Sequence, residues 1–245
     1  MLAASRHWRV GWSWLPAGVL AAALGALLPG QTQSVSQGPH RLEITLEKRE
    51  GAEWRAVDPR LVFQPEDQVR FRARTNFAGY LYVMNHSTSG QYTTLFPGEE
   101  TGRQNQVAPG RDYLVPATQG SFRITGPPGH EIVYWLFTPV ELGAGGEGGK
   151  PDYVPLPPPP KQKQPPPNLV PRCDETILRA RGDCVDIQAG PKPLPEGRRR
   201  PENLAGAVGA ASRDLVFVRR QNASVIAAPA TLAGPVIFEF RLAHR

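Results

Sequence analysis

Residues that could catalyse a hydrolysis occur in the segment NHSTSG. His86 stands beside Ser87 and close to Ser89, and a histidine next to a serine is the pair that activates a hydroxyl as a nucleophile. The G-x-S-x-G elbow is absent, no acidic residue is placed to orient the imidazole, and the segment has the composition of a hairpin turn. We therefore interpret these residues as polar positions of a turn.

A histidine and a carboxylate are adjacent again at His130 and Glu131, a pair that resembles half of a metal site. A metal motif on a helix needs a second histidine at helical spacing. Here His130 follows Pro-Pro-Gly, where a turn leads into a strand. The sequence therefore predicts no metal ligands and no cofactor.

The paired acidic residues Glu66-Asp67 and Glu99-Glu100 could serve a glycosidase, which uses two carboxyl groups. Both pairs fall in turn-like segments, so surface turns explain them more simply. No catalytic residues are predicted. A hydrolase acting on peptidoglycan or glycans stays as the alternative function, with acids or His130 brought together only by the fold.

Three tyrosines are the candidates for binding. Tyr80 and Tyr82 occupy alternate positions of YLYVMN and therefore share one face of a strand, and Tyr92 falls on the next strand. Aromatic side chains on a sheet can stack on sugars or pack against a partner. The competing interpretation makes them core residues or cross-strand pairs.

The two cysteines, Cys173 and Cys184, are separated by a short polar segment. In an oxidising compartment they would close a loop, which stabilises a fold by about 3 kcal/mol. No histidine or second cysteine pair lies nearby to form a zinc site, and the spacing is longer than that of a redox C-x-x-C pair. We predict a disulfide.

The tripeptide Arg181-Gly182-Asp183 directly before Cys184 could be displayed to integrins, but tripeptides occur easily by chance and no other feature suggests an adhesin.

Short strands follow one another from residue 40 to about residue 139. RLEITLEKRE alternates leucine and isoleucine with polar residues, and DQVRFRARTN alternates apolar residues with three arginines, as half-buried strands do. YLYVMN and EIVYWLF are apolar on both faces, which is typical of strands covered on two sides. Turn signals such as Pro97-Gly98 separate the strands. The predicted fold is all-β, an Ig-like or jelly-roll-type β-sandwich.

The composition of the chain changes after residue 141. GAGGEGGKP and VPLPPPPKQKQPPPNLVP predict a flexible and polyproline-like spacer over residues 142–171. DLVFVRR and PVIFEFRLAHR read as two further strands, and because two isolated strands are only marginally stable, we predict that they return to the first sheet. The predicted organisation is a leader at 1–34, a β-sandwich at 38–141, the spacer, and a C-terminal segment at 172–245. A second small domain stapled by the cysteines is the alternative.

The first residues have the pattern of a secretory signal. A basic start with Arg6 and Arg9 precedes the apolar run VGWSWLPAGVLAAALGALLPG. The run is nearly long enough to cross a bilayer, so an uncleaved N-terminal membrane anchor is the alternative. The sequence thus predicts an exported protein, located in the periplasm or at the cell surface.

The charge of the chain is only mildly basic, at +6. Removing the two arginines of the leader leaves 26 basic residues against 22 acidic ones, a net charge of +4. Basic residues are spread along strands rather than clustered, apart from Arg198-Arg199-Arg200, which we interpret as a solvated loop. Nucleic-acid binding is not expected.

Five motifs occur in a fixed order over about residues 60 to 140. They are a P-x-D turn at Pro65-Glu66-Asp67, a G-Y-L-Y-V strand at Gly79 to Val83, a T-x-L-F-P hairpin partner at Thr93 to Pro97, a segment around Gly110 to Pro116, and an F-x-x-x-G-P-P-G-x-E turn at Phe122 to Glu131. This series resembles a bacterial "domain of unknown function" family, number 4384. Pro109 stands where that family usually has alanine, and Gly98 where it has asparagine. The resemblance implies an exported or modular β-domain and brings no catalytic residues.

The expectation from the sequence is an exported, non-enzymatic β-domain of the bacterial cell envelope. It would bind an envelope polymer or a protein partner, neither of which the sequence identifies, or contribute structure.

Overall fold

The structure of the protein is a computed structural model that describes residues 39–98, 105–117, 120–139, 141–142, 159–163, 169–195, 215–228 and 235–245. These residues belong to one compact unit, Val35–Arg245. The predicted leader, the arginine triplet at 198–200 and most of the predicted spacer lie outside the described residues. Within the described ranges, no helix has the length and apolar character needed to cross a membrane.

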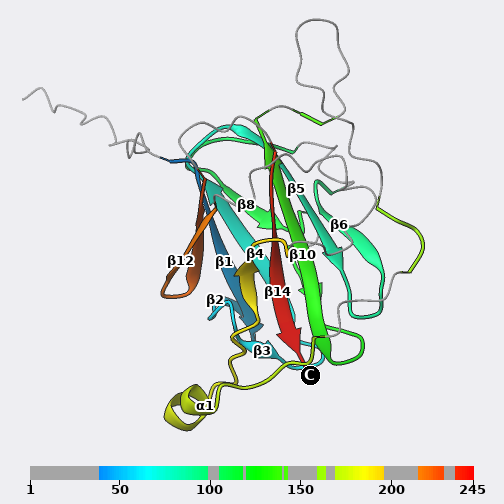
Figure 1. Ribbon diagram of the computed structural model, residues 1–245, viewed down its shortest axis with the longest axis vertical. Coiled ribbons are helices and arrows are strands. Elements are labelled where there is room, and N and C mark those ends of the chain that lie inside the picture. The colour runs from blue at the N-terminus through cyan, green and yellow to red at the C-terminus, as the bar shows by residue number, and fades with distance from the viewer. Residues whose placement is uncertain are drawn as a thin grey trace, which may run out of the picture. The chain divides into compact units, whose positions relative to one another are not determined.

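The strands form two sheets (Figure 1). Sheet 1 has the order β12 (Val216–Arg220), β13 (Ala223–Ala227), β1 (Arg41–Glu50), β4 (Gln68–Thr75) and β8 (Asp112–Val115), with β2 (Glu53–Ala56) paired to β1 and β9 (Phe122–Arg123) to β4. Sheet 2 has the order β11 (Gly190–Lys192), β14 (Val236–His244), β10 (Gly129–Thr138), β5 (Gly79–His86) and β6 (Tyr92–Phe96), with β3 (Val62–Phe63) paired to β14 and β7 (Gln106–Val107) to β5.

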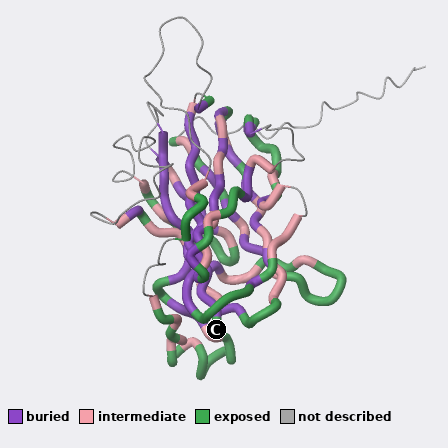
Figure 2. The backbone as a smooth tube through the Cα atoms, turned by 90° about the vertical axis from the view of Figure 1, so that its right-hand side faces the viewer, coloured by how far each residue is buried: buried purple, intermediate pink, exposed green. Residues whose placement is uncertain are grey.

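The two sheets pack face to face around one apolar core, which confirms the prediction of an all-β sandwich. The alternating apolar residues of β1 and β4 point inward, and residues of β5, β10 and β14 meet them from sheet 2. Phe71 of β4 contacts Trp135 of β10 and Phe240 of β14 edge to face, with ring centroids 5.3 Å and 5.1 Å apart. The buried residues are concentrated in the strands of the two sheets (Figure 2).

The C-terminal strands return to the sandwich, as predicted. β14 pairs antiparallel with β10 from Gly129↔His244 to Phe137↔Val236, and β13 pairs antiparallel with β1. β13 itself was not expected from the sequence. Its residues ASVIA follow a turn at Gln221, which has a positive φ of 46°. They do not alternate between apolar and polar types, so the segment lacks the clear pattern of the other strands.

Both faces of β10 are buried, because the segment that leads to β11 packs on the outer face of sheet 2. We call residues 169–195 the strap. Leu169 and Leu194 of the strap, together with Leu142, pack against Ile132 and Leu136 of β10 in a second apolar cluster. The apolar character of EIVYWLF on both faces thus reflects one face in the core and one face under the strap.

The strap also carries the helix α1 (Glu175–Arg181), which the sequence analysis did not predict. Asp174 caps its first turn by accepting from the amides of Thr176 and Ile177, and Gly182 ends it with a left-handed φ of 76°. The helix has no buried residues and lies at the end of the sandwich where β14 finishes (Figure 1).

Candidate functional site

The three predicted binding residues lie on the outer face of sheet 2. Tyr82 is paired in register with Leu136, whose side chain belongs to the outer cluster rather than to the core between the sheets. Tyr80 lies two positions earlier on the same face of β5, and Tyr92 of β6 is paired with His86 at the end of β5. All three tyrosines are partly exposed. We call Tyr80, Tyr82 and Tyr92 the tyrosine face.

Contacts hold two of these rings in place. The Tyr82 hydroxyl accepts a hydrogen bond from the Leu142 amide at 2.9 Å, and burial raises the pKa of Tyr82 above its ordinary value. Tyr92 stacks on the ring of His86, with ring centroids 4.2 Å apart and planes inclined by 13°. Rings that are already fixed lose little side-chain entropy when a ligand packs on them. The tyrosine face is therefore a preformed aromatic surface.

The serines beside His86 lie in the β5–β6 hairpin, which agrees with the interpretation of the segment as a turn. The hydroxyl oxygens of Ser87 and Ser89 are 2.7 Å apart, and the Gln91 amide donates to Ser87 Oγ at 3.2 Å. The Ser87 amide in turn donates to the Gln91 carbonyl oxygen at 2.8 Å. These hydrogen bonds close the hairpin.

His130 and Glu131 are adjacent in the sequence but point to opposite faces of β10, because side chains alternate along a strand. His130 lies on the outer face, where its Nε2 is 3.3 Å from Asp186 Oδ2 and its Nδ1 is 3.3 Å from the Leu169 carbonyl oxygen. Burial lowers the pKa of His130, while the Leu169 carbonyl and the Asp186 carboxylate oppose that effect. The imidazole thereby contacts two residues of the strap, Leu169 and Asp186.

The Glu131 carboxylate faces the other way, toward the end of the core. It accepts hydrogen bonds from Asn85 Nδ2 at 2.6 Å, from the Thr88 amide at 3.1 Å and from Thr88 Oγ1 at 3.3 Å. His244 Nε2 lies 3.5 Å from the same carboxylate. The buried carboxylate thus connects the β5–β6 hairpin to the end of β14.

The other acidic candidates form ion pairs or lie outside the described residues. Glu66 pairs with Arg123 at 2.7 Å, and Asp67 pairs with Lys48 at 2.8 Å. The Glu99-Glu100 pair is outside the described ranges. In the part of the chain that the structure describes, no three histidine, cysteine, aspartate or glutamate side chains are grouped so that they could hold a metal ion.

The arginines that alternate along β4 gather on the outer face of sheet 1, although the sequence suggested basic residues that are merely spread. Glu47, which is buried, receives Arg70 Nε at 2.6 Å and Arg72 Nη2 at 2.5 Å. Arg74 Nε lies 3.5 Å from Asp112. Because each arginine meets a carboxylate of a neighbouring strand, much of the positive charge on this face is compensated.

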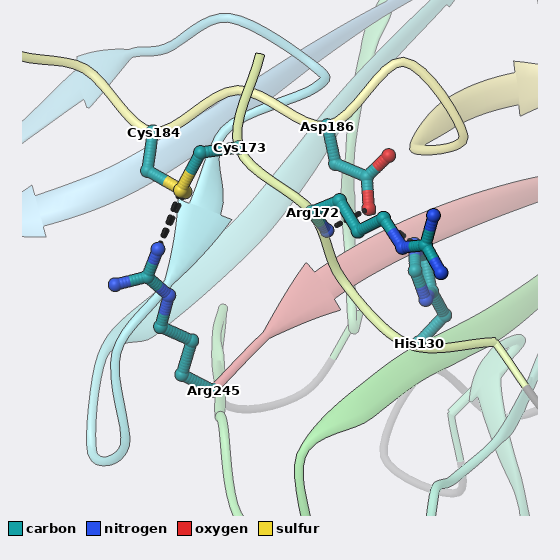
Figure 3. The surroundings of a disulfide bond; sticks show 6 residues. All are labelled: His130, Arg172, Cys173, Cys184, Asp186 and Arg245. Atoms are coloured by element: carbon teal, nitrogen blue, oxygen red, sulfur yellow. Dashed lines mark hydrogen bonds and ion pairs between the residues drawn. A yellow bond between two sulfur atoms is a disulfide. The ribbon is translucent and has the colours of Figure 1, made fainter. Parts of the chain in front are cut away.

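The predicted disulfide joins Cys173 and Cys184 and closes the loop that contains α1 (Figure 3). The guanidinium of Arg245 lies beside both sulfurs, with Nη2 in contact with Cys173 Sγ and 3.1 Å from Cys184 Sγ. The tripeptide at residues 181–183 is exposed at the end of α1.

Several buried charged residues were missed by the sequence analysis. Glu239 and Arg241 alternate with apolar residues in PVIFEFRLAHR, a pattern that is typical of a strand with one polar face. Both are buried and form an ion pair with each other, and Arg241 also contacts Gln188 of the strap. The strap covers this face of β14, and no local pattern reveals which distant segment covers a strand.

One segment of the chain matches a known protein family. Residues 62–141 match the family described as Domain of unknown function (DUF4384), which confirms the resemblance over that segment. The match covers less than half of the chain and includes β5, β6 and β10. No curated protein matches the chain, and no solved structure matches it.

Proposed function

We propose that this chain, in which residues 62–141 match a family of unknown function, is an exported, non-enzymatic binding module of the bacterial cell envelope. The tyrosine face would be its recognition surface, and the ligand would be an envelope polymer or a protein partner. One observation carries the proposal. Tyr80, Tyr82 and Tyr92 are partly exposed on the outer face of sheet 2, whereas the large residues of the neighbouring strand β10 are fully covered.

The chemistry of the tyrosine face suits such a role. Phenol rings offer an apolar surface for stacking and a hydroxyl for hydrogen bonding, which is why tyrosine is enriched at interfaces. The rings stand on two adjacent strands of one sheet, so their spacing is set by the sheet rather than by a loop. A surface of this kind binds by packing and needs no titrating group.

Export is supported by two features of the sequence. The basic and apolar leader has the pattern of a secretory signal. The Cys173–Cys184 disulfide is of a kind that persists in oxidising compartments. An uncleaved leader would keep the module attached to the membrane.

The alternative, an envelope hydrolase, receives less support from the geometry. Its candidate groups at His130 and Glu131 point to opposite faces of β10, and each is engaged by buried protein groups. Glu66 and Asp67 are paired with basic side chains at 2.7 Å and 2.8 Å. A general acid and base must approach the same substrate bond, and these groups do not converge.

The test is capture of partners from envelope extract, with purified peptidoglycan in parallel, by the mature protein and by the variants Tyr80→Ala and Tyr92→Ala. Trp54→Ala is the matched control, because Trp54 is a partly exposed aromatic residue of sheet 1. We expect the tyrosine variants to weaken binding of a captured partner at least tenfold, while the Trp54 variant binds like the wild type. Circular dichroism confirms the fold of each variant.

Equal binding by all folded variants would refute the tyrosine face as the recognition surface. Release of soluble fragments from peptidoglycan by the wild type, abolished in a folded Glu131→Gln variant, would instead establish the hydrolase. Tyr82→Phe gives a milder third variant, because it removes only the hydroxyl that accepts from Leu142.

A further inference from the structure

The disulfide of the strap is accessible and lies beside a positive charge. Cys173 and Cys184 are both partly exposed, and Arg245 is exposed. The Arg245 guanidinium contacts Cys173 Sγ and lies 3.1 Å from Cys184 Sγ (Figure 3). A cation next to a cysteine lowers the pKa of its thiol and stabilises the thiolate. A thiolate that is stabilised is also a better leaving group in disulfide exchange.

We propose that Cys173–Cys184 is a thiol–disulfide exchange site that accepts electrons from an external dithiol. A thiolate of the dithiol attacks one sulfur of the disulfide; a mixed disulfide forms, the Cys173–Cys184 bond breaks, and its electron pair goes to the leaving sulfur beside Arg245. The second thiol of the reductant, after losing its proton, attacks the mixed disulfide and releases the other cysteine. The dithiol is oxidised to a disulfide, and the two cysteines take up the two electrons and the two protons.

Arg245 can assist whichever sulfur leaves, because the guanidinium is within reach of both. Its own backbone is fixed, since the Arg245 amide donates to the Phe63 carbonyl oxygen of β3 at 3.1 Å. In the sequence, the two cysteines are farther apart than in a C-x-x-C redox pair, which argued against an exchange site. The fold supplies the neighbouring cation that such motifs obtain from a helix terminus or a nearby basic residue.

The loop around the disulfide is also held by contacts that do not involve sulfur. The Asp174 amide donates to the Val185 carbonyl oxygen at 2.7 Å, and the Val62 amide of β3 donates to the Cys184 carbonyl oxygen at 2.9 Å. The Arg172 amide donates to Asp186 Oδ2 at 2.9 Å. These bonds hold the backbone on both sides of Cys173 and on the C-terminal side of Cys184, so we expect the two thiols to remain close enough after reduction to be oxidised again.

The experiment uses the full protein in native buffer with dithiothreitol as the dithiol. Free thiols are trapped with a maleimide at successive times and counted by mass spectrometry. We expect the wild-type disulfide to be reduced without denaturant, and the Arg245→Gln variant to be reduced about three- to tenfold more slowly. Arg245→Lys retains a cation and should recover most of the rate. Arg172→Gln is the matched control, because Arg172 directly precedes Cys173 but its side chain points away from the sulfurs (Figure 3).

A second readout separates electrostatic assistance from a merely structural role. The reduced wild type is alkylated with iodoacetamide over a range of pH, and the titration is repeated on the reduced protein in denaturant. Thiolate should form at lower pH in the folded protein than in the unfolded chain, and Arg245→Gln should remove most of that difference. The proposal is overturned if the wild-type disulfide yields only in denaturant, if Arg245→Gln and Arg172→Gln react alike, or if folding does not shift the thiolate titration.

Discussion

Acidification should loosen the strap through His130, which is buried between β10 and the strap. Burial lowers the pKa of His130 below its ordinary value of 6.5. The groups that face the ring are the Leu169 carbonyl at 3.3 Å, the Asp186 carboxylate at 3.3 Å and the more distant charges of Arg241 and His244. The Leu169 carbonyl and Asp186 favour the imidazolium, whereas burial, Arg241 and His244 disfavour it.

The sign of the pH dependence follows from that lowered pKa. As the pH falls below 6.5, the unfolded chain binds a proton that the folded protein resists, so the free energy of unfolding decreases until the pH reaches the folded-state pKa of His130. The pH dependence from this group fades as the pH rises above 6.5, because the unfolded chain then loses the same proton. A single histidine that stays neutral in the folded state would cost at most about 1.4 kcal/mol between pH 7.5 and pH 5.5.

The assay is urea denaturation at pH 7.5 and pH 5.5 for the wild type and for His130→Gln. Glutamine cannot titrate, and its amide can still donate to the Leu169 carbonyl. The variant therefore subtracts the titration of all other groups, and we expect the wild type to lose about 1 kcal/mol more than the variant on acidification. Equal losses would refute a neutral, buried imidazole. A smaller loss in the wild type would mean that Asp186 outweighs burial.

Three further substitutions test the packing that positions the site, each by urea denaturation. Glu131→Ala should cost about 2–4 kcal/mol, because the amide and hydroxyl of Thr88 would be left buried without their acceptor; a cost below 1 kcal/mol would contradict the assigned role. Gly79→Ala should cost about 1–3 kcal/mol, since the new Cβ would lie 2.7 Å from the Thr138 carbonyl oxygen, and an unchanged midpoint would show that β10 yields easily. Phe71→Ala should cost about 3–5 kcal/mol, because this fully buried ring joins the two sheets; a loss near 1 kcal/mol would mean that the core collapses around the gap.

The strands could be predicted because their signal is local. RLEITLEKRE alternates apolar and polar residues, and the structure has β1 over the same residues, Arg41–Glu50. YLYVMN and EIVYWLF lack a polar face and became β5 and β10, two inner strands of sheet 2. The position of the tyrosines on one face followed from the same period of two. Each of these predictions depends on residues within one strand.

The features that could not be predicted depend instead on contacts between segments far apart in the chain. Glu239 and Arg241 are buried, although nothing in the sequence of β14 indicates that the strap covers them. His130 lies far from Asp186 in the sequence, and Arg245 is well beyond the disulfide it contacts. Long-range contacts of this kind are determined by topology, which a single sequence without a solved relative does not specify.

The outer face of sheet 2 is divided into two parts, and this division connects the tyrosine face to the strap. Over β10 and β14 the strap supplies Leu169 and Leu194, which complete an apolar cluster in cis. Over β5 and β6, Tyr82 and Tyr92 pack against the same cluster, and they and Tyr80 stay partly exposed. The sequences of β5 and β10 are apolar on both faces, which is typical of strands that are covered on two sides. The chain itself thus covers the part beneath the strap, and under the proposed function a partner would cover the tyrosine face.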